Sequence, residues 1–196
     1  RFFTKNDELV FDPYIIKEAA GKKIGFVGVT TPETIRDEAK FFQNQTGDER
    51  YGLRQDETGE ALYTAVQEAV DGVRAEGVDY VYLMAHLGLS SSSEPWTYDD
   101  VISNVSGIDV VLDGHSHDIE QDVMKDKDGK EVVRSACGTK LEAVGYSLIT
   151  ADSGITDTNI WTWSNKKTVP ELLGIENDMN AAIKKANDEI AETANR

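Results

Sequence analysis

The sequence predicts an α/β fold for the first part of the chain and a run of β-hairpins after it. Before about residue 123, short apolar runs of strand length alternate with stretches of helical periodicity, which is typical of βαβ units. After that point, turn signals separate short predicted strands, which is typical of hairpins. A last stretch of helical periodicity closes the sequence.

The first strand and helix signals lie between residues 13 and 33. Pro13-Tyr14-Ile15-Ile16 is read as a short extended lead-in, and residues 23–30 (K-I-G-F-V-G-V-T) predict a strand. Thr31-Pro32-Glu33 suits the start of a helix, because proline is favoured in the first turn. Residues 40–57 have no clean period and predict a long loop.

A long amphipathic helix is predicted from about Gly59 to Ala75, with Gly77 as its end signal. Its apolar positions repeat at helical spacing: Ala61, Leu62, Ala65, Val66, Ala69, Val70 and Val73. An apolar run over residues 78–85 then predicts a strand. Thr97 and Asp100 resemble a capping box that opens a short helix ending near Val105. Residues 110–112 predict a further buried strand.

The last part of the chain predicts hairpins and a helix. Residues 126–130 (D-K-D-G-K) form a turn signal between strands 120–125 and 131–136, and two more strands are predicted over 143–151 and 155–163. A long C-terminal helix is predicted from an apolar face: Leu172, Ile175, Met179, Ile183, Ala186 and Ile190.

Composition limits the classes of partner. The chain has 196 residues, 36 acidic and 20 basic, and a net charge of −16. This charge disfavours DNA or RNA as a ligand, but a bound metal ion can reverse it locally for a small phosphoester. No segment is long and apolar enough to cross a membrane. Cys137 is the single cysteine, so an internal disulfide is impossible.

All three histidines follow predicted strands. His86 directly follows the run 78–85. His115 and His117 follow the strand 110–112 and the turn Asp113-Gly114. Open α/β sheets bind ligands at the carboxyl ends of their strands, so this placement predicts a metal site. The alternative is one histidine satisfied in the core and two in a loop.

Two other features near the histidines are given modest roles. Asp113 is expected to cap the turn or to orient His115 rather than to bind metal. Residues 90–93, four serines in a row, predict a solvated loop, since no spare histidine is left to activate a serine nucleophile.

Three segments resemble the calcineurin-like metallophosphoesterase family, and within it the 5′-nucleotidase and 2′,3′-cyclic-nucleotide phosphodiesterase branch. They are G-K-K-I-G-F-V-G-V-T-T-P-E-T (21–34), V-D-Y-V-Y-L-M-A-H-L-G (78–88) and I-D-V-V-L-D-G-H-S-H (108–117). The resemblance implies a four-layer α/β/β/α sandwich with two divalent metal ions, Zn²⁺ or Mn²⁺. It implies that His86 and His115 bind one ion and His117 the other, with Asp113, Gly114 and Ser116 supporting these ligands.

The resemblance covers roughly residues 10–165 and lacks the family's upstream D-x-H, G-D and G-N-H-[DE] segments. Residues 1–165 are therefore expected to be the C-terminal half of the catalytic domain. Residues 166–196 are expected to be a linker and an amphipathic helix leading toward an absent second domain. The missing half would leave one sheet face uncovered, so we expect self-association.

The function implied by the resemblance is release of phosphate from 5′-nucleotides by metal-activated water, in a protein exported to the periplasm or cell surface. The chain alone is expected to be inactive or nearly so, and no catalytic residue is assigned on it. Three alternatives stay open: a 2′,3′-cyclic-nucleotide phosphodiesterase, a protein with one zinc ion on His86, His115 and His117, and a non-catalytic module.

Overall fold

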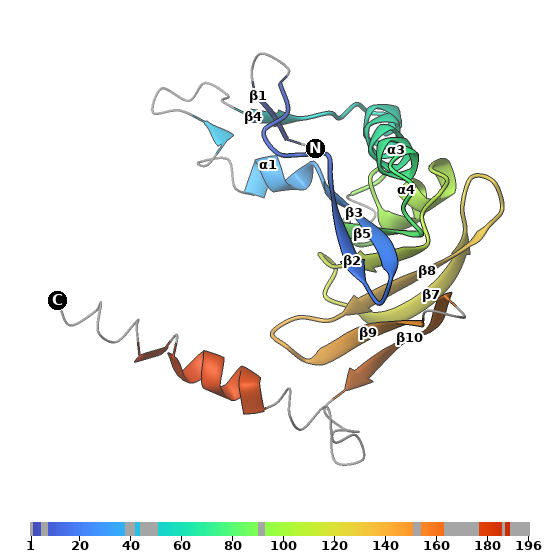
Figure 1. Cartoon of the computed structure of the whole chain (residues 1–196). Coiled ribbons are helices and arrows are strands. Elements are labelled where there is room, and N and C mark those ends of the chain that lie inside the picture. Colours follow the sequence, from blue (N-terminus) through green and yellow to red (C-terminus); the bar gives the residue numbers. More distant parts are fainter. Residues whose placement is uncertain are drawn as a thin grey trace.

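The structure, a computed structural model, describes residues 2–4, 8–37, 42–43, 51–89, 93–150, 154–162, 177–185 and 187–188 (Figure 1). Its centre is a six-stranded sheet in the order β2-β3-β5-β6-β8-β7. Neighbouring strands from β3 to β8 run parallel, and the edge strands β2 and β7 are antiparallel to their neighbours. The strands are β2 (Tyr14–Ala19), β3 (Lys22–Thr30), β5 (Tyr80–His86), β6 (Val110–Asp113), β7 (Ile119–Lys125) and β8 (Glu131–Cys137).

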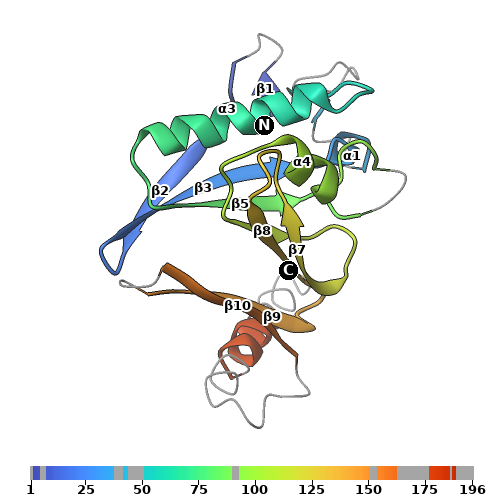
Figure 2. The same cartoon turned by 90° about the vertical axis from the view of Figure 1, so that its right-hand side faces the viewer.

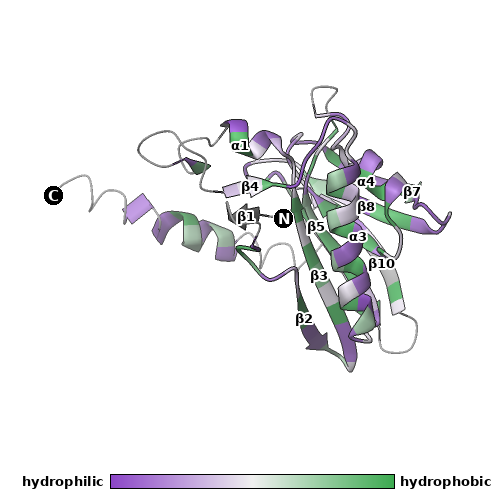
Figure 3. Cartoon of the chain, turned by 90° about the horizontal axis from the view of Figure 1, so that it is seen from above, coloured by the Kyte–Doolittle hydropathy of each residue, from purple (hydrophilic) through white to green (hydrophobic). Residues whose placement is uncertain are grey.

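Two helices, α3 (Glu60–Ala75) and α4 (Tyr98–Asn104), cover one face of this sheet (Figure 2). Both were predicted, and the capping box of Thr97 and Asp100 is present at the start of α4. The apolar stripe of α3 is buried and packs on β3 and β5, whose residues are coloured mostly hydrophobic in Figure 3. The buried residues of this main core include Val27, Leu62, Val70, Val73, Leu83, Ile102 and Val111.

A two-stranded antiparallel sheet of β9 (Ala143–Thr150) and β10 (Gly154–Thr162) lies against the other face (Figure 2). Ile149 and Ile155 of this second sheet pack against a smaller core of Ile24, Tyr82 and Val110. Among the described residues the layers are therefore helices, six-stranded sheet and two-stranded sheet. This α/β arrangement agrees with the predicted fold class, and the predicted fourth layer stays a proposal.

The hairpin of β7 and β8 differs in its placement from the prediction of a separate run of hairpins. β8 pairs in parallel with β6, with Arg134 opposite Val111, so the hairpin extends the central sheet. Local sequence signals reported the turn correctly, but the partner of β8 lies more than twenty residues away. Only tertiary packing could decide which strand it joins.

The prediction of a long loop over residues 40–57 is wrong in part. Residues Tyr51–Leu53 form strand β4, which pairs antiparallel with β1 (Phe2–Thr4). A three-residue strand has too few positions to show a period, and its partner is distant in the sequence. A short helix α1 (Glu33–Asp37) follows β3, as the Thr31-Pro32-Glu33 signal predicted.

The C-terminal region is described only in part. Residues 177–185 and 187–188 are helical, Ile183 is 47% exposed, and this helix lies apart from β9 and β10 (Figure 1). Leu172, Ile175, Ala186 and Ile190 of the predicted apolar face, and the predicted boundary at residue 165, lie outside the described residues. Within the described part of the chain, no helix has the length and apolar character needed to span a membrane.

Candidate metal centre

The three histidines lie at the same edge of the central sheet. His86 is the last residue of β5, and His115 and His117 follow Asp113, the last residue of β6. β5 and β6 are adjacent and parallel, so their carboxyl ends meet at one edge. This is where α/β sheets place their ligands.

His86 and His115 face each other through their ring nitrogens. Nε2 of His86 lies 3.3 Å from Nδ1 of His115, and the two ring planes are inclined at 66°. Two nitrogen ligands on one tetrahedral zinc ion, each about 2.0–2.1 Å from it, lie about 3.3–3.4 Å apart. The separation of this histidine pair therefore fits two ligands of a single ion.

Glu33, at the start of α1, supports the far side of the His115 ring. Nε2 of His115 lies 2.9 Å from Oε2 of Glu33, whose side chain is buried. An ionised carboxylate can only accept hydrogen bonds, so Nε2 of His115 carries the proton. In the neutral ring the other nitrogen, Nδ1, then presents its lone pair toward His86, which is the form a metal ligand needs.

The ionisation of Glu33 and His86 suits this arrangement. A hydrogen bond from Ser93 lowers the pKa of Glu33, and bonds from His115 and Arg36 add to the effect, which together outweigh the burial that raises it. Burial lowers the pKa of His86, and repulsion from His115 and His117 in their protonated forms lowers it further against the opposing effect of Asp113. At neutral pH the carboxylate is charged and the His86 imidazole is neutral.

The carboxylate of Asp113 accepts hydrogen bonds from backbone N–H groups and not from a histidine ring. Its buried carboxylate accepts the backbone N–H of Leu87 at 2.9 Å and of Gly88 at 3.2 Å, and it lies 3.0 Å from Nη2 of Arg134. It thus joins the loop after β5 to the end of β6. We find Asp113 tying together the two segments that carry the histidines.

The two other supporting residues, Gly114 and Ser116, lie in close packing with the loop after β5. A Cβ atom on Gly114 would lie 3.4 Å from Nδ1 of His86, and one on Gly88 would lie 2.9 Å from the backbone nitrogen of Ser116. The hydroxyl of Ser116 donates a hydrogen bond to Asp118. The absence of a side chain at Gly88 lets the two loops approach this closely, whereas a Cβ atom on Gly114 would make an ordinary contact.

His117 stands at the exposed side of the site. Its ring acts electrostatically on His86, but no group of three or more histidine, cysteine, aspartate or glutamate side chains in the described residues is arranged to hold an ion. The chain therefore brings together two of the three predicted ligands as a pair and places the third nearby.

Sequence reasoning missed three residues of this site: Glu33, Ser93 and Arg134. Ser93 was predicted to lie in a solvated loop, but it is fully buried and donates a hydrogen bond to Glu33; residues 90–92 lie outside the described residues. A signal for Glu33 did exist, since it follows a strand end just as the histidines do. Nothing local marked Ser93 or Arg134, because their partners are distant in the sequence.

Comparison with known proteins relates the chain to nucleotide phosphoesterases. No family model matches it. It is 28% identical over 128 residues to a 2′,3′-cyclic-nucleotide 2′-phosphodiesterase/3′-nucleotidase of Salmonella typhimurium, covering 58% of this chain and 18% of that protein. It is 23% identical over 128 residues to the trifunctional nucleotide phosphoesterase YfkN of Bacillus subtilis, covering 58% of this chain and 8% of that protein.

The fold is shared with solved structures of the same group. A crystal structure of the calcineurin-like phosphoesterase YfkN from Bacillus subtilis matches with a TM-score of 0.62 and 18% identity, over 88% of this chain and 60% of that one. The chain thus spans only part of the proteins that it matches. Both kinds of comparison confirm its resemblance to the calcineurin-like phosphoesterases of the nucleotidase and cyclic-nucleotide phosphodiesterase group, over a part of their length.

Proposed function

We propose that this chain supplies part of the active site of a divalent-metal-dependent hydrolase that releases phosphate from 5′-nucleotides. The observation that carries the proposal is the pair of facing nitrogens on His86 and His115, 3.3 Å apart at the carboxyl edge of two parallel strands. The relatedness to nucleotide phosphoesterases supports a small phosphoester as substrate.

Each residue has a distinct part in this proposal. His86, through Nε2, and His115, through Nδ1, would hold one ion, and His117 would contribute to a second. When bound, a divalent ion supplies polarisation of the phosphate oxygens and a water of lowered pKa. Glu33 keeps the proton on Nε2 of His115, so that Nδ1 stays free to bind. The remaining ligands would come from further sequence of a longer protein.

The same proposal extends to architecture and location. We take residues 1–165 to be the C-terminal half of a four-layer metallophosphoesterase domain and residues 166–196 to lead toward a second domain. We also take the parent protein to act outside the cytoplasm. The family resemblance stated from the sequence supports these points.

The first experiment measures metal binding by the purified chain with Zn²⁺ and Mn²⁺ in a calorimetric titration. We expect weak binding that is lost in His86→Ala and His115→Ala and kept in Asp128→Ala, a control in an exposed turn. Failure of millimolar Zn²⁺ to bind, or binding unchanged in both histidine variants, would contradict the proposed ligands. Tight binding of one zinc that is lost in each of the three histidine variants would favour the three-histidine alternative.

A phosphate-release assay with added Mn²⁺ accompanies the titration. We expect the chain alone to stay at background with AMP and with 2′,3′-cyclic AMP, because its ligand set is incomplete. Robust turnover would overturn the half-domain proposal. The cyclic substrate is the second candidate, favoured by the relatedness to a 2′,3′-cyclic-nucleotide 2′-phosphodiesterase. The same assay on the longer parent protein decides between the two substrates.

A further inference from the structure

The backbone that carries His115 and His117 adopts an unfavourable conformation. The φ angles are 86° at His115 and 60° at His117, both in the left-handed region that residues other than glycine rarely occupy. Such conformations persist only where the surrounding structure holds them in place. The loop of residues 114–117 therefore needs contacts that fix its two ends.

Arg134 of β8 contacts both ends of this loop. Its side chain is fully buried, with Nη2 lying 3.0 Å from Asp113 and Nη1 lying 2.5 Å from Asp118. Asp113 directly precedes the loop and Asp118 directly follows it. One planar guanidinium thus joins the two carboxylates on either side of the four residues that hold His115 and His117. A guanidinium suits this role because its donors form a rigid fork.

The same guanidinium acts on the loop that follows His86. Asp113, which Arg134 orients, accepts the backbone N–H groups of Leu87 and Gly88. The backbone next to His86 and the backbone of the His115 loop therefore depend on one carboxylate and one guanidinium. This shared anchor connects the two backbone segments that carry the facing histidine rings.

The surroundings of Arg134 hold the guanidinium in one orientation. Its Cζ atom lies 4.0 Å from the centre of the Tyr98 ring, and Nη1 lies 3.8 Å from Glu120 and 3.7 Å from Asp122. Its Nε atom has no hydrogen-bond partner among the described residues, although it is buried. The hydrogen bonds of this arginine are thus directed to the carboxylates around the loop.

A second arginine, on helix α3, forms an ion pair with an aspartate that precedes β6. Arg74 of α3 lies 2.5 Å from Asp109 and donates hydrogen bonds to the carbonyl of Gly107, just before β6 begins. This pair joins helix and sheet at the opposite end of β6 from the histidines. It provides a reference for the loss of an arginine–aspartate contact away from the histidines, at a place where the arginine is partly exposed.

We propose that Arg134 is a positioning residue, whose guanidinium clamps Asp113 and Asp118 and so holds His115 and His117 in place beside His86. The clamp is a property of the protein alone. Its effect on metal affinity rests on the function proposed above, in which these histidines are ligands.

The test compares Arg134→Met, Asp118→Asn and the control Arg74→Met. Without added metal, hydrogen exchange is measured at the amides of Leu87 and Gly88, which bond to Asp113. Zn²⁺ affinity is measured on the same samples, together with unfolding by urea. We expect Arg134→Met to speed exchange at both amides and to weaken Zn²⁺ binding, each at least tenfold, and Asp118→Asn to act in the same direction. Arg74→Met should lower the free energy of unfolding, leave Zn²⁺ affinity unchanged, and speed exchange at both amides by no more than this lower free energy of unfolding accounts for.

The variant Arg134→Lys tests whether the two-sided contact of the guanidinium or only its positive charge is needed. A lysine keeps the positive charge but ends in a single ammonium group, which cannot hold both carboxylates in one plane. We expect it to leave Zn²⁺ affinity and exchange close to the values of Arg134→Met. Full rescue by lysine would overturn the clamp.

The outcomes also separate this proposal from the proposed function. Exchange and Zn²⁺ affinity in Arg134→Met and Asp118→Asn that match Arg74→Met would overturn the clamp while leaving the metal site standing. Faster exchange in Arg134→Met, in a chain whose unaltered form binds no Zn²⁺, would support the clamp and contradict the metal site. If Arg134→Met does not fold, Asp118→Asn decides, because Asp118 is partly exposed and its substitution is milder.

Discussion

Nε2 of His86 lies 3.3 Å from Nδ1 of His115, although 28 residues separate the two histidines in the chain. Two parallel strands bring them to one sheet edge, and Glu33 and Asp113 fix what lies around them. The site is thus built from the ends of β3, β5 and β6. Its electrostatics and its close packing lead to the following predictions.

The neutral state of His86 can be measured directly. We expect its ring protons to titrate below the ordinary pKa of 6.5 in an NMR titration, mainly because of burial. His115→Ala should raise this pKa, since the repulsion from a protonated His115 is removed. Because the unfolded chain binds more protons between the two pKa values, this histidine makes stability rise with pH up to about 6.5. A His86 that titrates above 6.5 would contradict this prediction.

The hydrogen bond from Ser93 is the main cause that lowers the pKa of Glu33. Ser93→Ala should therefore raise this pKa, as measured by ¹³C NMR of the carboxyl carbon. A lowered pKa in the folded state stabilises the fold above the unfolded value of 4.5, and this stabilisation is lost as the pH falls below it. Urea unfolding from pH 6 to pH 3 should show a shallower loss in Glu33→Gln. An equal loss of unfolding free energy in the unaltered chain and in Glu33→Gln would contradict the prediction.

Gly88 has a φ of 64°, and a Cβ atom there would lie 2.9 Å from the backbone nitrogen of Ser116 and 3.1 Å from the His115 ring. Gly88→Ala should lower stability by more than the about 1–2 kcal/mol of left-handed strain alone, and it should weaken Zn²⁺ binding by moving the histidine loop. Gly129→Ala is the matched control, since Gly129 has a φ of 84° with nothing within 4 Å of the added atom. It should show the strain without the loss of affinity.

Leu83 and Met84 are neighbours on β5 that point to opposite faces of the sheet. Leu83 is fully buried in the main core, whereas Met84 is 44% exposed. Leu83→Ala should destabilise the fold by about 2–5 kcal/mol, and Met84→Ala by at most about 1 kcal/mol, in urea unfolding. Similar losses for the two variants would mean that the outer face of β5 is covered in solution.

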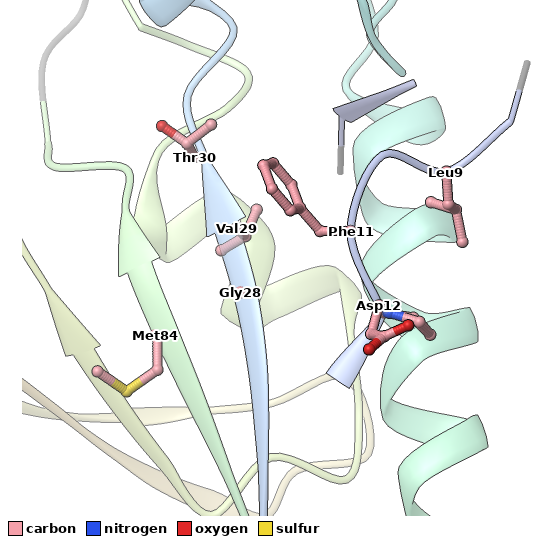
Figure 4. A pocket seen from close by; sticks show the side chains of 8 residues that line it. Leu9, Phe11, Asp12, Gly28, Val29, Thr30 and Met84 are labelled. Atoms are coloured by element: carbon pink, nitrogen blue, oxygen red, sulfur yellow. The ribbon is translucent and has the colours of Figure 1, made fainter. Parts of the chain in front are cut away.

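An apolar pocket of about 270 Å³ lies between the segment Leu9–Pro13 and the strands β3 and β5, and Met84 is one of its lining residues (Figure 4). Phe11 and Met84, which line it, and the nearby strand residue Ile15 are 68%, 44% and 53% exposed. We expect a second copy of the chain to cover this surface, so light scattering should report a mass that rises with concentration. Met84→Lys should reduce the association, and Leu148→Lys, at an exposed position of β9, should not. A clean monomer at high concentration would contradict self-association.

Much of the fold follows from local patterns in the sequence. The period of α3, the capping box of α4 and the D-K-D-G-K turn each depend on residues close in the chain, and each appears where predicted. The strand ends also predicted where all three histidines lie, because a parallel strand delivers its last residue to one edge of the sheet.

The features that only the tertiary structure decided are contacts between residues far apart in the sequence. The pairing of β4 with β1, the joining of β8 to β6, and the burial of Ser93 against Glu33 each depend on contacts across at least 20 residues. Arg134 is the clearest case. In the sequence it is an ordinary charged residue of a hairpin strand, and only the pairing of β8 with β6 places its guanidinium between Asp113 and Asp118. A sequence pattern reports period and spacing, whereas a buried charge is defined by the groups that surround it in space.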